Sequence, residues 1–268
     1  MDIRRQVYEN YNISFSVFCK GETMNESLSL KELGKKNAAM KSLDFVSEGM
    51  VIGLGTGSTA DWFLELLAIK IMKENLKVVG VPTSTKTFQK AKKLGIPLGT
   101  LEEVFELNLV IDGADEFDPQ FNLIKGGGGA LLQEKIVAAA TGHMIVISDY
   151  TKRVQVLGAF PLPVEVVKFG AKSTLHNIRR LLSDLNYSGV SFSWRTVDGN
   201  FFTTDEQHYI LDLHLKKIKS VEELEKGLLS CPGVVETGLF TGLAKTIITG
   251  ELDGTCQISE LKNNNAIK

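Results

Sequence analysis

Acidic, basic and glycine residues gather between positions 112 and 134 of the chain. Asp112 and Asp115 follow directly on the apolar run Leu109-Val-Ile111. Lys125 comes a few residues later and precedes four consecutive glycines. Paired carboxylates at the end of a buried strand suit either a metal ion or hydroxyl groups that gain and lose protons. Because the Lys125 ammonium would compete with a metal ion, proton transfer is the better interpretation.

The glycines after Lys125 predict a bare loop that can hold a negative oxygen. Gly126, Gly127 and Gly128 carry no side chains, so their amides are exposed beside the ammonium. The alternative is a flexible loop, but ordering four glycines costs considerable entropy, which favours a functional reason. Glu134 follows in the first turns of a predicted helix, where an acid ordinarily complements the helix dipole. From the residue pattern alone, Glu134 is one candidate for a catalytic base.

A second glycine-rich motif follows an earlier apolar strand and opens a predicted helix. Glycines allow a ligand to approach the backbone, and helix N-terminal amides favour anions. The motif is neither GxGxxG nor a Walker P-loop, so a smaller phosphorylated or polyhydroxylated ligand is preferred to a nucleotide. The alternative is a tight turn with a Ser/Thr helix cap. The candidate binding residues are Gly55, Thr56, Gly57, Ser58 and Thr59.

Alternating elements in the first half predict a parallel α/β sheet covered on both faces. Helices are expected at 30–47, 59–72, 86–94 and 131–140, and strands at 50–53, 77–81, 107–111 and 144–148. Ligands of such sheets bind outside the carboxyl ends of the strands. Four polar clusters fall at these ends: Gly55–Thr59, Thr83–Thr85 with Ser84, Asp112–Glu116 with Gly113 and Ala114, and Ser148–Lys152.

The pattern changes after residue 158 and predicts a second, smaller domain. Strands at 164–167, 191–196, 209–215 and 234–240 and helices at 173–185 and 221–229 give the order βαββαβ of ferredoxin-like folds. The Asp198-Gly199 pair predicts a hairpin turn from which strand 209–215 returns. A last strand at 244–249 is expected to rejoin the first domain. The predicted organisation is a flexible extension at 1–30, a Rossmann-like domain at 31–158 and 241–268, and an α+β domain at 159–240.

Composition limits the partners of the chain. The net charge of −2 favours neither nucleic acid nor an anionic membrane surface. No apolar run reaches the roughly 18 residues of a membrane span, and the first 20 residues make a poor signal peptide. Three cysteines without a CxxC pair favour a reducing compartment and no structural zinc. We therefore expect a cytoplasmic protein that binds neither nucleic acid nor membrane.

Taken together, the motifs resemble one family, ribose-5-phosphate isomerase of the A type. The resemblance covers about residues 34–255, and the combination of motifs is far more specific than any single one. An N-terminal extension and Gln133, where arginine is frequent, depart from the family pattern. The matching pieces are Gly53-Leu-Gly-Thr-Gly-Ser-Thr-Ala60, Asp112-Gly-Ala-Asp-Glu116, Leu123-Ile-Lys-Gly-Gly-Gly-Gly-Ala-Leu131, Glu134-Lys135, Lys152 and Pro161-Leu-Pro-Val-Glu-Val166.

The resemblance implies interconversion of D-ribose 5-phosphate and D-ribulose 5-phosphate in the non-oxidative pentose phosphate pathway, without a cofactor or a metal. It implies that Glu134 is the base that moves a proton between C2 and C1 through an enediolate. It also implies that Asp112, Asp115 and Lys125 assist ring opening and stabilise the oxygens. Lys35 and Lys152 match substrate-binding positions, although Lys36 adjoins Lys35. Homodimers or homotetramers are common in the family.

Two other functions share this architecture. A sugar-phosphate-sensing effector domain of a transcription regulator would bind the sugar without reacting, and would need a DNA-binding segment. Residues 1–33 have few bases and no clear helix-turn-helix. A coenzyme A transferase would use a glutamate nucleophile to form a covalent intermediate.

Overall fold

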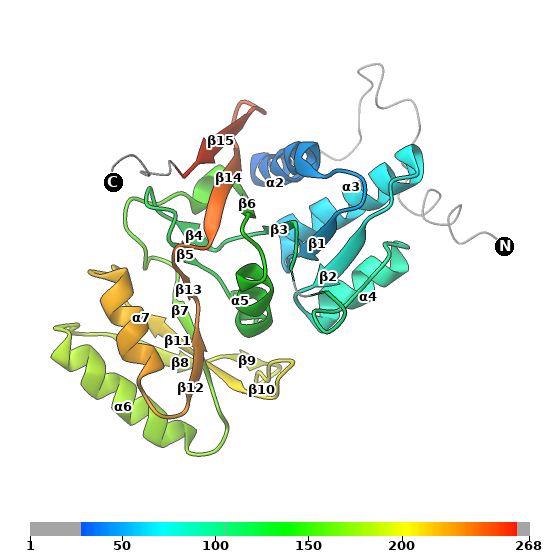
Figure 1. Cartoon of the computed structure of the whole chain (residues 1–268). Coiled ribbons are helices and arrows are strands. Elements are labelled where there is room, and N and C mark those ends of the chain that lie inside the picture. The colour runs from blue at the N-terminus through cyan, green and yellow to red at the C-terminus, as the bar shows by residue number, and fades with distance from the viewer. Residues whose placement is uncertain (1–27, 105, 262–268) are drawn as a thin grey trace, which may run out of the picture.

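The computed structural model describes residues 28–104 and 106–261. Most of the predicted extension, residues 1–27, therefore lies outside the described residues, as do residues 262–268. The centre of the molecule is a six-stranded sheet in the order β15-β14-β6-β3-β1-β2 (Figure 1). Its strands are β1 (Val51–Leu54), β2 (Val79–Pro82), β3 (Leu109–Asp112), β6 (Met144–Asp149), β14 (Ala244–Gly250) and β15 (Cys256–Glu260).

Five of these strands are parallel, and β15 pairs antiparallel with β14 at one edge. The expected return of the chain to this sheet through a last strand is confirmed, because β14 pairs with β6. The strands are apolar on both faces. In β6, Ile145 and Ile147 pack into one core while Met144 and Val146 pack into another. This double burial is the reason the strands read as continuous apolar runs.

Helices cover both faces of the sheet. Ala38 of α2, Phe63 of α3 and Ala91 of α4 pack into the core on one face. Val137 of α5 packs into the core on the other face. The α/β fold expected from the sequence is therefore confirmed. The helices are α2 (Leu30–Ser42, followed by the 3₁₀ turn η2, Leu43–Phe45), α3 (Ser58–Glu74), α4 (Thr85–Lys93) and α5 (Leu131–Ala139).

The order in which strands are added to the sheet reverses between β1 and β3. Counted in chain order, the five parallel strands stand as 2-1-3-4-5, so successive strands are added to one side of β1 and then to the other. Loops at such a switch point diverge and leave a crevice at the carboxyl ends of the strands. The glycine motif 55–59 follows β1 and runs into the first turn of α3, and Asp112 is the last residue of β3. Two of the predicted clusters thus meet at the switch point.

A second sheet, with strand order β12-β7-β11-β8, is antiparallel throughout. Together with its two helices it forms the βαββαβ unit expected from the sequence, around its own apolar core. In Figure 1 this unit lies below α5. Its domain boundaries stay a prediction. The elements are β7 (Leu162–Val166), α6 (Ala171–Asp184), β8 (Ser191–Trp194), β11 (Tyr209–His214), α7 (Val221–Leu229) and β12 (Val234–Thr237).

Two details differ from the expectation. The Asp198-Gly199 turn has positive φ at both residues, as a tight hairpin requires, but it joins β9 (Thr196–Val197) to β10 (Asn200–Phe201). The prediction that β11 returns directly from this turn was wrong, because the hairpin is an excursion between β8 and β11. The second difference is a three-stranded sheet of β4 (Glu116–Phe117), β5 (Leu123–Ile124) and β13 (Leu239–Phe240), which the sequence did not indicate.

Lys135 on α5 forms ion pairs with residues of the βαββαβ unit. Its ammonium lies 2.7 Å from a carboxylate oxygen of Glu236 in β12 and 3.2 Å from one of Glu225 in α7. Since Lys135 adjoins Glu134 on α5, the same helix contributes to the site and to the contact with the second sheet. Within the described residues, no helix is both long and apolar enough to cross a membrane.

Candidate active site

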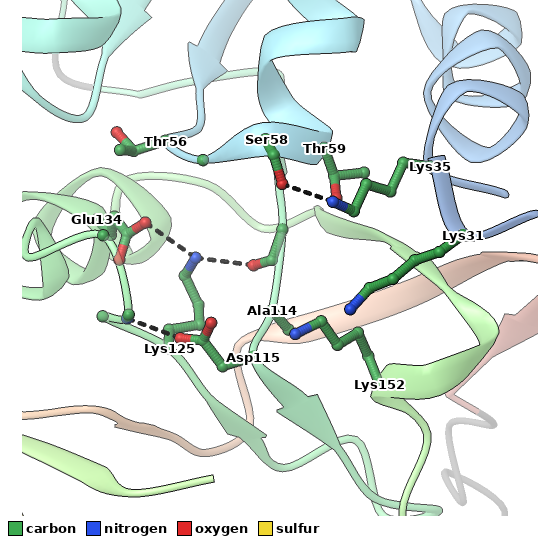
Figure 2. Close-up of a pocket in the computed structure, with 15 residues that line it drawn as sticks. Lys31, Lys35, Thr56, Ser58, Thr59, Ala114, Asp115, Lys125, Glu134 and Lys152 are labelled. Atoms are coloured by element: carbon green, nitrogen blue, oxygen red, sulfur yellow. Dashed lines mark hydrogen bonds and ion pairs between the residues drawn. The ribbon is translucent and has the colours of Figure 1, made fainter. Parts of the chain in front are cut away.

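A polar pocket opens at the switch point of the parallel sheet. Figure 2 shows its two ends: the ammonium groups of Lys31, Lys35 and Lys152 lie on one side, and Glu134 and Lys125 lie on the other. The loops after β1 and β3, the glycine loop (residues 126–129) and the N-terminal half of α5 form the walls. The lining residues are Lys31, Lys35, Thr56, Gly57, Ser58, Thr59, Gly113, Ala114, Asp115, Lys125, Gly126, Gly127, Gly128, Glu134 and Lys152.

The Lys125 ammonium forms the floor of the pocket between two carboxylates. It lies 2.8 Å from Asp112 Oδ2 and 3.2 Å from Glu134 Oε1, and it donates to the carbonyl of Gly113 at 2.8 Å. The face of the Phe240 ring lies 5.5 Å from it. Burial by itself lowers the pKa of a lysine, but the two carboxylates raise the pKa of Lys125 above its ordinary value. The lysine is therefore a permanent buried cation.

Asp112 is the better satisfied of the two carboxylates. Its Oδ1 accepts from the backbone N–H of Gly113 at 2.7 Å and of Thr56 at 3.0 Å, while Oδ2 faces the ammonium as an ion pair without hydrogen-bond geometry. The bond from Thr56 crosses the switch point and joins the loops after β1 and β3. Burial raises the pKa of Asp112, and the Lys125 charge opposes that rise. Asp112 has no exposed surface, so it holds the lysine rather than a ligand.

Glu134 has the properties of a tuned base. It is 3% exposed, and its Oε2 is buried without a hydrogen-bond partner. Burial raises the pKa of Glu134 to about 8; the Lys125 ammonium lowers it and the Asp112 charge adds to the rise. A carboxyl group with a pKa near neutrality can both accept and return a proton at physiological pH. Glu134 reaches this position because α5 begins at Leu131, directly after the glycine loop.

Asp115 faces the glycine loop from across the pocket. Its Oδ2 accepts from the backbone N–H of Gly127 at 2.7 Å. A Cβ at Gly127 would lie 2.6 Å from the Asp115 carboxylate, so only glycine allows the loop to come this close. Gly126 has a φ of 97°, a backbone conformation that also favours glycine. Glycine at 127 is thus explained by the close approach of the backbone to an acid, and glycine at 126 by its backbone conformation.

The opposite end of the pocket is built for an anion. Gly57 precedes α3 with a φ of 122° and has no side chain to cap the helix, so the N-terminal amides of α3 face the pocket. Lys35 is buried, and its ammonium donates to Ser58 Oγ at 2.9 Å and to Glu32 Oε1 at 2.6 Å. Lys152 reaches the pocket from the short 3₁₀ turn η3 (Tyr150–Lys152), which Asp149 caps by accepting from the N–H of Thr151.

The structure separates Lys35 from its neighbour and adds a residue that the sequence reading missed. Lys35 lines the pocket, whereas the Lys36 ammonium lies over the ring of Trp62, 5.4 Å from its centroid. Lys31 also lines the pocket, and Figure 2 shows its ammonium beside that of Lys152. Lys31 and Lys35 are four residues apart on α2 and so share a helix face. That spacing was the available signal, but one helical spacing among 30 basic residues is weak.

The arrangement suits proton transfer on a small phosphorylated molecule. Three ammonium groups and a helix N-terminus at one end can neutralise a phosphate. A buried base beside a buried cation at the other end can remove a proton next to a carbonyl and stabilise the charge that forms. Among the described residues, no group of three or more His, Cys, Asp or Glu side chains is placed to hold a metal ion.

Comparison with known proteins decides the family. The family model for ribose 5-phosphate isomerase A (phosphoriboisomerase A) matches residues 79–254. A ribose-5-phosphate isomerase A from Cereibacter sphaeroides is 48% identical over 243 residues, which are 91% of this chain and 93% of the relative. The chain belongs to the ribose-5-phosphate isomerase A family. A second member, from Rhodopseudomonas palustris, is 51% identical over 224 residues, covering 84% of this chain and 96% of that protein.

Solved structures of the isomerase family have the same fold. Ribose 5-phosphate isomerase from Plasmodium falciparum matches with a TM-score of 0.81 and 37% identity, covering 85% of this chain and 98% of that one. A D-ribose-5-phosphate isomerase in complex with phospho-erythronic acid matches with a TM-score of 0.79 and 35% identity, covering 86% and 99% of the two chains. The family resemblance inferred from the motifs is therefore confirmed.

Three of the residues expected to bind substrate in this isomerase-family chain have other contacts. Ser84 is not among the pocket-lining residues; it caps α4 by accepting from the N–H of Thr87 at 3.0 Å. Thr56 lines the pocket, but its hydroxyl donates to Ser84 Oγ and contacts the hydroxyls of Thr83 and Thr87. Gly55 lies behind the wall, where a Cβ would meet the Asp112 carboxylate at 2.2 Å. The polar strand ends thus hold one another together as well as forming the pocket.

Proposed function

We propose that this chain is a ribose-5-phosphate isomerase that interconverts D-ribose 5-phosphate and D-ribulose 5-phosphate without a cofactor. The observation that carries the proposal is the buried Glu134 carboxyl, with a pKa of about 8, one oxygen unpartnered and the other 3.2 Å from the Lys125 ammonium. A carboxylate in this setting is suited to moving a proton next to a carbonyl group. The family membership supplies the substrate.

The phosphate is assigned to the end of the pocket that has the lysines. Lys31, Lys35 and Lys152 supply positive charge there, and the amides of Ser58 and Thr59 at the start of α3 supply donors. Binding energy at this remote, unreactive group positions the sugar carbons at the other end. The hydroxyl of Ser58 is itself held by Lys35, so cation and helix terminus act as one site.

Glu134 is assigned the proton transfer on the open-chain sugar. Its carboxylate takes the proton from C2 of the aldose, and the electron pair of the C2–H bond forms the C1–C2 double bond of an enediolate. The negative charge develops on O1, beside the Lys125 ammonium. Glu134 then returns the proton to C1, while the hydroxyl proton of O2 passes to O1 and O2 becomes the ketose carbonyl. Atoms and charge balance without an added reagent.

Lys125, Asp112 and Asp115 support these steps in different ways. Lys125 stabilises the oxyanion, and Asp112 keeps the lysine charged and oriented. Asp115 is bonded to the glycine loop and faces the pocket. As the furanose ring opens, its carboxylate can take the proton of the O1 hydroxyl while C1=O1 forms and the C1–O4 bond breaks, and it can return that proton to O4. In the glycine loop the amides of Gly127 and Gly129 are bonded within the protein, and the Gly128 amide is assigned as a further donor for the sugar oxygens.

The test is incubation of the purified chain with ribose 5-phosphate alone, followed by detection of the ketose. We expect ribulose 5-phosphate to form, and expect Glu134→Gln to lower kcat by about 10²–10⁴-fold, the usual contribution of a general base. Phospho-erythronic acid should still bind to this variant. Glu222→Gln makes the same change of side chain at an exposed position of α7; it serves as the control and should be fully active.

The outcomes separate the candidate functions. A sensor domain would bind ribose 5-phosphate without making ketose. A coenzyme A transferase would require an acyl-CoA and would form a covalent adduct on its glutamate. Ketose formation at an equal rate in Glu134→Gln would remove the proposed base while leaving the isomerase activity in place.

We further infer a homo-oligomer, a dimer or tetramer, working in the cytoplasm. The β9–β10 hairpin supports an interface, because Val197 and Phe201 are each more than half exposed there. Light scattering of the purified protein tests this: the mass of a single 29.4 kDa chain in solution would contradict it. Cell fractionation tests the location.

A further inference from the structure

The backbone of the glycine loop is hydrogen-bonded by an arginine that directly follows a strand of the second sheet. Arg195 lies between β8 and β9, and its Nη1 donates to the carbonyl oxygens of Gly126 at 2.6 Å and Gly127 at 3.2 Å. These glycines also line the pocket. The loop therefore has substrate space on one side and a guanidinium on the other.

Asp212 fixes the arginine in turn. Arg195 Nε donates to Asp212 Oδ2 at 3.1 Å, and Nη2 donates to Asp212 Oδ1 at 2.5 Å. Such a two-point pair sets the plane of the guanidinium as well as its position. The two side chains are only 16% and 14% exposed, so solvent does not compete strongly for them. Asp212 lies on β11, in the middle of the second sheet, which makes the anchor rigid.

The orientation of the carbonyls determines the orientation of the amides. In a planar trans peptide the C=O and the following N–H point in opposite directions. Because Arg195 holds the carbonyl of Gly126, the N–H of Gly127 must point away from it, and that N–H does donate to Asp115 Oδ2 across the loop. By the same rule, the contact to the carbonyl of Gly127 directs the N–H of Gly128 away from Arg195, and Gly128 lines the pocket.

The segment between β10 and β11 makes other contacts with the glycine loop and with α5. The Phe202 ring packs so closely on Gly129 that a Cβ there would lie 2.4 Å from it. Gln133 on α5 donates to Glu206 Oε1 at 2.7 Å. Arg195 differs from these contacts in acting on the peptides that face the substrate. Without such a contact, a run of glycines would sample many backbone conformations.

We propose that Arg195, held by Asp212, is a positioning residue that keeps the Gly127 amide on Asp115 and aligns the Gly128 amide for the oxygens of the enediolate. This inference rests on the proposed isomerase function and deepens it. The pair touches no substrate and acts through the peptides it holds. Donors that are already aligned need not reorganise when charge develops, so the effect falls on the transition state more than on substrate binding.

The test compares Arg195→Lys with the control Arg180→Lys on the exposed face of α6. Lysine keeps the charge but cannot hold two carbonyls and Asp212 in one plane. We expect Arg195→Lys to lower kcat by about 10–100-fold, as for small displacements of catalytic groups, with KM for ribose 5-phosphate changed less than about threefold. The inhibition constant of phospho-erythronic acid, whose planar carboxylate resembles the enediolate, should rise by a factor close to the loss in kcat/KM. The control should match the wild type.

The other outcomes distinguish a failure of the proposed role of Arg195 and Asp212 from a failure of the proposed isomerase function. If the wild type makes no ribulose 5-phosphate, the proposed function and this inference fall together. If the wild type is active and Arg195→Lys has the same kcat and KM, or if KM rises in the variant with kcat unchanged, only the positioning role of Arg195 is overturned. Thermal unfolding is measured on every variant. Where Arg195→Lys is unfolded, Asp212→Asn takes its place, because it leaves the arginine present but free to turn; the same division between kcat and KM is expected from it.

Discussion

One buried ammonium, that of Lys125, lies between the buried carboxylates of Asp112 and Glu134. This excess of acids over cations decides which side chain of the site takes up a proton. Lys125 can neutralise only one negative charge. Asp112 accepts two backbone N–H groups on Oδ1 and pairs its Oδ2 with the ammonium at 2.8 Å, whereas Glu134 accepts only from Lys125, at 3.2 Å, and its Oε2 has no hydrogen-bond partner. The carboxylate with fewer partners is the one that more readily takes up a proton. The exchangeable proton of the trio is therefore assigned to Glu134.

The activity should depend on pH through this group. The base must be unprotonated, and the pKa of Glu134 is raised from 4.5 to about 8. We expect kcat/KM to rise about tenfold per pH unit below that pKa and to level off above it. The phosphate of the substrate ionises near pH 6 and adds a separate, lower bend. A profile that is already flat from pH 5 to 9 would show that the base is an ordinary, solvated carboxylate.

Removal of the lysine should affect stability and catalysis separately. Lys125→Met leaves the Asp112 charge buried without a cation, a change that costs about 3–5 kcal/mol. We expect the double variant Lys125→Met/Asp112→Asn to regain much of that free energy of unfolding in urea titrations. Its kcat should stay reduced by about 10²–10³-fold, because the oxyanion still lacks its cation. A double variant as unstable as the single one would contradict the ion-pair account.

The elements contribute to the site through their ends and through one helix face. Loops after β1, β3 and β6 bring the glycine motif, Asp112 and Lys152 to the same edge of the sheet. Helix α2 contributes differently, by presenting Lys31 in its first turn and Lys35 one turn further on. The helix thus supplies charge at the phosphate end through two side chains.

Lys31 tests this role of α2. We expect Lys31→Ala to raise KM for ribose 5-phosphate by about 3–10-fold with little change in kcat, because the lysine meets the unreactive phosphate and contributes equally to ground and transition states. Lys36→Ala is the matched control, since its ammonium lies over Trp62. Equal effects of the two changes would mean that Lys31 acts only through long-range charge.

Across the whole molecule, helix α2 is positioned by a backbone contact with the end of β14. Gly250 at the end of β14 lies against Gly34 of α2, so closely that a Cβ on Gly250 would lie 2.0 Å from the Gly34 carbonyl oxygen. Residues more than 200 positions apart in the sequence thus determine where Lys31 and Lys35 lie. Strand β14 supports the site for this reason, although it contributes no side chain to the pocket lining.

Gly250→Ala should therefore weaken both the fold and substrate binding. Forcing a methyl group into a filled contact costs about 1–3 kcal/mol. We expect a lower Tm and a higher KM than in Gly142→Ala, where the exposed glycine has open space for a Cβ and an ordinary φ. An unchanged KM in a folded Gly250→Ala protein would mean that α2 is positioned by other contacts.

Most helices and strands of the parallel sheet, and the polar residues at their ends, could be predicted from the sequence. Helix 221–229 was predicted with its observed bounds, and the strands of the parallel sheet were found because each buries two faces and so reads as an apolar run. The two-residue strands β4, β5 and β13 carry no such pattern, and β15 has no buried residue. Their existence depends on pairing with distant segments.

The tertiary structure alone decided which polar residues reach the pocket. Lys31 and Lys35 were brought to it while Lys36 was not, and Ser84 was directed into a hydroxyl cluster instead. It also decided that Glu134 is buried beside one cation shared by two acids, and that cause of its raised pKa cannot be read from neighbours along the chain. Sequence patterns report local geometry and burial, whereas charge coupling and close backbone contacts arise only once remote segments have packed together.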